Sequence, residues 1–100
     1  FVSADDVSKG KPDPQPYAKG AELNHVNITN CFVVEDAPAG VLSGKRAGAR
    51  VLAVKTTHDA ERLWRQGADF VVDNLTKVKA RWSGNKIVLT IDSELRPSFE

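Results

Sequence analysis

Three short apolar runs, separated by longer segments with helical spacing, organise the first three quarters of the chain. The first run, at 31–34, is rich in β-branched and aromatic residues and is bounded by turn residues, which is typical of a strand buried on both faces of a sheet. The runs predict strands at 31–34, 51–54 and 70–72, and residues 1–3 have the pattern of a further strand end. The intervening segments predict helices at 14–24, 37–47 and 60–66. Because strands and helices alternate, we expect an α/β fold with parallel strands and right-handed crossovers.

The residues at the ends of these segments favour helix termini. Asp13 can cap the first helix, with Pro14 at its first position. In the second helix Lys45 and Arg46 lie in the last turn, where cations interact favourably with the helix dipole, and Gly48 suits the position after the end.

Small residues within the helices predict where they pack closely. Val41, Gly44 and Ala47 give the second helix a narrow face that can lie close to a sheet. Gly20 in the first helix costs about 1 kcal/mol relative to alanine, so we expect close packing there too. Glu61 and Arg65 are four residues apart in the third helix and predict an ion pair.

The last quarter of the chain has a different period. Residues 78–82 and 86–91 alternate between apolar and polar positions, and a turn at 83–85 separates them. This pattern predicts a β-hairpin.

Composition excludes several classes of protein. One hundred residues with a net charge of +1 fit one small domain, and no basic tract favours nucleic acid or a membrane surface. No apolar run is long enough to cross a bilayer. Cys31 is the only cysteine, so we expect a buried, reduced thiol and a cytoplasmic protein. Since the sequence starts at Phe1 and has no methionine, we expect a piece of a longer protein or a partial gene model.

Two adjacent carboxylates are the main candidates for chemistry. Glu35 and Asp36 directly follow the first of the three strands, where open α/β sheets bind their ligands. Oxygen ligands of this kind suit Mg²⁺, and Lys11 on a separate loop could hold an anion that the metal neutralises.

Each candidate also has a purely structural interpretation. Lys11 could be a solvated loop lysine, and either acid could cap the helix that follows, since acids favour a helix N-terminus. His58 is interpreted as a loop residue and Asp13 as a cap, not as catalysts.

Residues 10–14 (Gly-Lys-Pro-Asp-Pro), 34–40 (Val-Glu-Asp-Ala-Pro-Ala-Gly) and 45–48 (Lys-Arg-Ala-Gly) together resemble the haloacid-dehalogenase-like hydrolases. The resemblance covers nearly the whole chain and is strongest to the subgroup of glycerol-phosphate and 2-deoxyglucose-6-phosphate phosphatases. It implies that residues 1–100 are the C-terminal portion of one Rossmann-like core domain, with β/α units at 1–77 and a hairpin tail at 78–92.

The resemblance also implies roles for the candidate residues. Lys11 matches the family's third motif, where a lysine pairs with the nucleophilic aspartate and a phosphoryl oxygen. Asp36, with Glu35, matches the fourth motif, which binds Mg²⁺. The implied reaction is phosphoryl transfer to an aspartate followed by hydrolysis, on a small phosphorylated polyol or sugar. We expect the full-length protein to be monomeric.

The chain departs from the family pattern in what it lacks. The first motif, which supplies the nucleophile, the second motif and the cap are absent, so we expect the 100 residues alone to be inactive. Asp92 and Glu94 follow a strand in acid-x-acid spacing, but they lie at the wrong end of the chain for the first motif. Two alternatives stay open: a non-catalytic domain that binds phosphate or a protein, and a phosphomutase.

Overall fold

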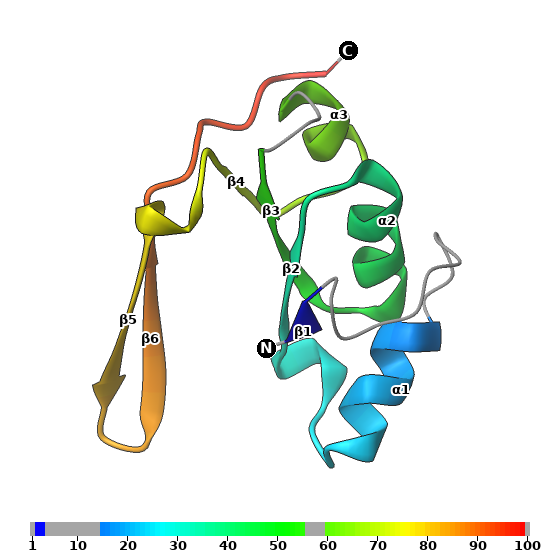
Figure 1. The fold of residues 1–100 in the computed structure, drawn as a ribbon, viewed down its shortest axis with the longest axis vertical. Helices are drawn as coiled ribbons and strands as arrows, with labels where there is room; N and C mark the ends of the chain where they lie inside the picture. Colours follow the sequence, from blue (N-terminus) through cyan, green and yellow to red (C-terminus); the bar gives the residue numbers. More distant parts are fainter. Residues whose placement is uncertain (1, 4–14, 56–59, 100) are drawn as a thin grey trace.

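The computed structural model describes residues 2–3, 15–55 and 60–99, and its largest element is a parallel four-stranded sheet (Figure 1). The strands occur in the order β1–β2–β3–β4, and each pairs in parallel with its neighbour. Their bounds are Val2–Ser3, Phe32–Glu35, Arg50–Val54 and Phe70–Val72. The α-helices are α1 (Gln15–Leu23), α2 (Pro38–Ala47) and α3 (Ala60–Arg65). The predicted α/β fold is confirmed.

The helices cover one face of the sheet and build the core there (Figure 1). Residues of alternating position on the strands face the helices, because successive strand side chains point to opposite faces. The fully buried members of this core from the strands are Val33, Val51, Ala53 and Val71, and those from the helices include Tyr17, Val41 and Leu63.

The opposite face of β2 is less covered than the sequence predicts. Val33 and Glu35 are buried, whereas Phe32 and Val34 are only partly buried. The prediction of a strand buried on both faces is therefore wrong for β2 within the described residues. The reason is that no described helix packs on this face; the hairpin stands beside it (Figure 1). A groove lies between the hairpin and the sheet.

Glycine lets α2 approach the sheet closely, as predicted. A Cβ on Gly44 would lie 2.8 Å from Val51 Cγ2 and 3.2 Å from Val33 Cγ1. Gly48 ends the helix in the left-handed conformation, with φ of 95°, which a residue without a Cβ adopts at little cost. Gly20 differs from expectation: a Cβ there would meet nothing within 4 Å, so close packing does not explain this glycine.

Two short 3₁₀ turns occupy segments that lead into strands. The segment between α1 and β2 contains η2 (Ile28–Asn30), and the Asn27 side chain caps it by accepting a hydrogen bond from the Thr29 N–H. A similar turn, η3 (Leu75–Lys77), precedes the hairpin. The Glu61–Arg65 ion pair is present, at 3.3 Å.

The predicted hairpin is confirmed as β5 (Val78–Ser83) and β6 (Lys86–Ile91), an antiparallel pair separate from the main sheet. Its register puts apolar residues opposite one another on one face, while the other face carries basic residues. The apolar cross-strand pairs are Val78 with Ile91, Ala80 with Leu89 and Trp82 with Ile87.

The segment after the hairpin returns to the main sheet and is bound to β4. The Ser93 hydroxyl accepts from the Val71 N–H and donates to the Val71 carbonyl, and the Glu94 N–H also donates to that carbonyl. Lys55, which follows β3, forms ion pairs with Glu94 at 2.8 Å and Asp73 at 3.3 Å. The tail thereby covers the free edge of the sheet.

None of the helices in the described segments is long and apolar enough to cross a membrane.

We predict that Gly44→Ala destabilises the fold by about 1–3 kcal/mol, because the added methyl overpacks the contact between α2 and the sheet. Gly20→Ala is the matched control. Its added methyl would meet no atom within 4 Å, so Gly20→Ala should stabilise the fold by about 0.5–1 kcal/mol. Urea unfolding of both variants measures the difference. Equal effects of the two substitutions would contradict the close contact of Gly44.

The ion pairs of Lys55 predict a dependence of stability on alkaline pH. The hydrogen bond to Glu94, and then that to Asp73, raises the pKa of Lys55 above its ordinary value of 10.5. A raised pKa stabilises the fold below the unfolded-state pKa, and this stability is lost as pH rises through the folded-state value. The melting temperature of Lys55→Gln should therefore lie below that of wild type at neutral pH, and the gap should close above pH 10.5. A gap that persists there would exclude the charge as its cause.

Candidate active site

Glu35 and Asp36 lie together at the carboxyl end of β2, but in different environments. Glu35 is the last residue of the strand and its side chain is 2% exposed. Asp36 follows outside the strand and is exposed. Asp36 lies beyond the end of β2, so the sheet does not bury it. One carboxylate is therefore fixed in the interior, and its neighbour is open to solvent.

The Glu35 carboxylate is held by groups from two elements. The Tyr17 hydroxyl, on α1, donates to Oε2. The Asp36 backbone N–H donates to Oε1 at 3.2 Å. The first turn of α2 packs so closely that a Cβ on Gly40 would lie 1.9 Å from Glu35 Cδ. These contacts satisfy both oxygens of a buried acid, as burial of a charged group requires.

The structure does not show either acid as the side-chain cap of α2. Ala37 occupies the N-cap position without a side-chain hydrogen bond, and the first turn contains no acidic residue. Pro38 begins the helix, with its missing N–H at a position that needs no partner. Neither carboxylate therefore belongs to the N-cap residue of α2.

Charged residues also follow the neighbouring strands, at the same carboxyl end of the sheet as Glu35 and Asp36. Lys55 follows β3, Asp73 follows β4, and Glu94 reaches them from the tail. Glu94 and Asp92 were the acid-x-acid pair noted in the sequence. Glu94 is paired with Lys55, and the backbone N–H of Asp92 donates to the Lys77 carbonyl. Glu94 thus has a clear structural role.

Lys11, Asp13 and His58 lie outside the described residues. Their predicted roles therefore stay predictions.

The two carboxylates fit part of a magnesium site. Mg²⁺ is usually bound through one or two carboxylates together with waters and substrate phosphate oxygens, so it does not need a protein cage. Within the described segments, no group of three or more histidine, cysteine or acidic residues could hold a metal. Asp36 supplies an exposed carboxylate, the kind of hard oxygen donor that such an open site uses, and Glu35 lies next to it, buried and with both oxygens hydrogen-bonded.

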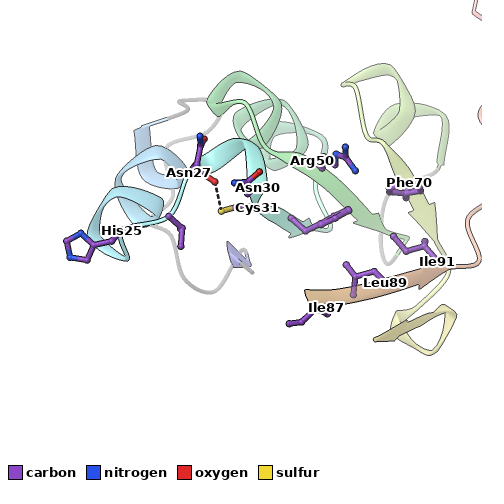
Figure 2. Close-up of a pocket in the computed structure, with 11 residues that line it drawn as sticks. His25, Asn27, Asn30, Cys31, Arg50, Phe70, Ile87, Leu89 and Ile91 are labelled. Atoms are coloured by element: carbon purple, nitrogen blue, oxygen red, sulfur yellow. Dashed lines mark hydrogen bonds between the residues drawn. The ribbon is translucent and has the colours of Figure 1, made fainter. Parts of the chain in front are cut away.

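A groove lies at the other end of the sheet, between the strands and the hairpin (Figure 2). It has a volume of about 790 Å³, and the sheet residues that line it, Phe32, Arg50 and Phe70, begin their strands. Cys31 borders it; this thiol is buried, as predicted, and donates to the Asn27 carbonyl at 3.4 Å. Because parallel strands share their direction, this groove is remote from the carboxylates at the opposite edge.

Tyr17 is the residue of this site that the sequence did not reveal. A buried tyrosine needs a partner for its hydroxyl, so an apolar face of α1 that contains Tyr17 signals a polar contact. The helical pattern alone does not say that the partner is Glu35, because 18 residues separate the two.

Comparison with known proteins gives the family. The family model described as haloacid dehalogenase-like hydrolase matches residues 1–54. Validoxylamine A 7'-phosphate phosphatase of Streptomyces hygroscopicus subsp. limoneus is 47% identical over 82% of this chain and 37% of its own length. Glycerol-1-phosphate phosphohydrolase 2 of Saccharomyces cerevisiae is 38% identical over 79% of this chain and 34% of its own. The chain therefore spans about a third of the length of these relatives.

A solved structure supports the same family. A Bacteroides vulgatus protein proposed to be a β-phosphoglucomutase matches with a TM-score of 0.64 at 32% identity, over 74% of this chain and 31% of its own. The motifs at residues 10–14 and 34–40, the parallel sheet and the family match agree with one another, and the chain belongs to the haloacid dehalogenase-like hydrolases.

Proposed function

We propose that the protein containing this chain is a Mg²⁺-dependent phosphatase of small phosphorylated polyols or sugars. The observation that carries the proposal is the pair Glu35–Asp36 at the carboxyl end of β2 in a chain of this family. The relatives support the substrate class, since their names include phosphatases of glycerol 1-phosphate and of validoxylamine A 7'-phosphate.

In this proposal Asp36 is a direct ligand of Mg²⁺, because it is exposed at the sheet edge. Glu35 is the second acidic residue of the site and acts directly or through a water. The bound metal would offset the repulsion between a phosphate dianion and an anionic nucleophile. Lys11 pairs with a phosphoryl oxygen and with the nucleophile.

The proposed reaction has two steps. An aspartate elsewhere in the protein attacks phosphorus, the alcohol leaves and takes up a proton, and an aspartyl phosphate forms. Water then attacks this phosphate, which releases inorganic phosphate and restores the carboxylate. Within the chain, residues 1–77 supply the part of the core that holds Asp36 and Lys11, and residues 78–92 form a hairpin tail.

A phosphomutase is the second candidate, favoured by the likeness to the Bacteroides vulgatus protein. It would use the same aspartyl phosphate but return the phosphoryl group to another hydroxyl of the sugar. We expect the complete gene product to release inorganic phosphate from glycerol 1-phosphate or a hexose phosphate. Product analysis by ³¹P NMR tests this, and an isomerised sugar phosphate without free phosphate would identify the mutase. Clear turnover of either kind would exclude the third possibility, a non-catalytic domain.

We predict that Asp36→Asn in the complete gene product lowers kcat/KM by about 100-fold or more. Loss of a metal ligand removes several kcal/mol of transition-state stabilisation, and about 1.4 kcal/mol corresponds to tenfold. Lys11→Ala should have an effect of the same order. Asp73→Asn is the matched control, since Asp73 is also an exposed acid that follows a strand at this edge. Wild-type activity of Asp36→Asn, or equal losses in the two Asp variants, would contradict the proposed role.

A further inference from the structure

Tyr17 connects α1 to the candidate metal site through one buried hydrogen bond. Its side chain is fully buried, and its hydroxyl donates to Oε2 of Glu35. A buried phenol and a buried carboxylate both need partners, so stability alone explains why the pair exists. Stability does not explain why the pair lies next to the candidate metal site. Glu35 is the residue immediately before Asp36, which is proposed to bind Mg²⁺.

The contacts around Glu35 fix one orientation of its side chain. Tyr17 donates to Oε2, the Asp36 N–H donates to Oε1, and α2 packs so closely that a Cβ on Gly40 would lie 1.9 Å from Cδ. Glutamate otherwise has three rotatable side-chain bonds, and ordering such a side chain costs free energy. Here that cost is met on folding, before any metal arrives.

We propose that Tyr17 is a positioning residue for the metal site: its hydroxyl holds the Glu35 carboxylate beside Asp36 and so raises the affinity of the site for Mg²⁺. This inference rests on the proposed function, because it assumes that Glu35 and Asp36 belong to a metal site. Groups that hydrogen-bond to the acids of a metal site orient them and tune the metal, and their loss typically weakens metal binding by about 10–100-fold. In this role Tyr17 acts on the metal through Glu35.

The test measures Mg²⁺ affinity of the complete gene product by isothermal titration calorimetry, without substrate. Tyr17→Phe keeps the ring and removes only the hydroxyl, so we expect the Kd for Mg²⁺ to rise by about 10–100-fold. In the Glu35→Gln background the same substitution should leave the Kd unchanged, since there is no carboxylate to position. Ala21→Gly, buried one turn further along α1, is the control for a loosened helix and should keep the wild-type Kd.

A second variant decides the matter if Tyr17→Phe does not fold. Glu35→Asp keeps the charge but withdraws the carboxylate from the Tyr17 hydroxyl, so it should also raise the Kd. A wild-type Kd in either folded variant would overturn the positioning role. So would an equal effect of Tyr17→Phe with and without Glu35, because Tyr17 would then act on something else.

The outcomes separate this inference from the proposed function. If wild type binds Mg²⁺, Asp36→Asn abolishes binding and Tyr17→Phe has no effect, the metal site stands and only the role of Tyr17 fails. If wild type binds no Mg²⁺ at all, the proposed metal site fails and the role of Tyr17 fails with it.

Discussion

The need to satisfy a buried carboxylate at the end of β2 constrains the arrangement around it. Glu35 lies at 2% exposure in a position where an unpartnered charge would strongly destabilise the fold. A hydroxyl on α1 and the backbone N–H of Asp36 each donate a hydrogen bond to it. The helix α1, the strand β2 and the start of α2 must therefore meet at one point, and that point is beside Asp36.

Close packing of α2 makes this meeting geometrically feasible. Gly40 leaves room for the Glu35 side chain, and Gly44 lets the helix rest against Val33 and Val51. The tail after the hairpin binds the outer strand of the sheet, because Ser93 is hydrogen-bonded to Val71 on β4. The sheet that carries the acids is therefore held by α1 and α2 at β2 and by the tail at β4, through contacts that involve no ligand.

The sequence predicted the order of elements and the parallel pairing well, because short β-branched runs and helix-terminating glycines are local signals. It placed Glu35 and Asp36 at the strand end for the same reason. It failed where the answer depended on distant partners. The Glu35 carboxylate is hydrogen-bonded to Tyr17, 18 residues away, and the partly covered face of β2 lies opposite the hairpin, across a groove. Gly20 had a reasonable local interpretation that the packing does not support.

The central claim is that Asp36, beside the buried Glu35, binds the catalytic Mg²⁺. The most direct measurement is a crystal structure of the complete gene product soaked with Mn²⁺ and phosphate, with the metal located by its anomalous scattering. The account predicts an anomalous peak bonded to the Asp36 carboxylate, with the Tyr17–Glu35 hydrogen bond intact behind it. A peak at another set of residues, with Asp36 facing solvent, would contradict it.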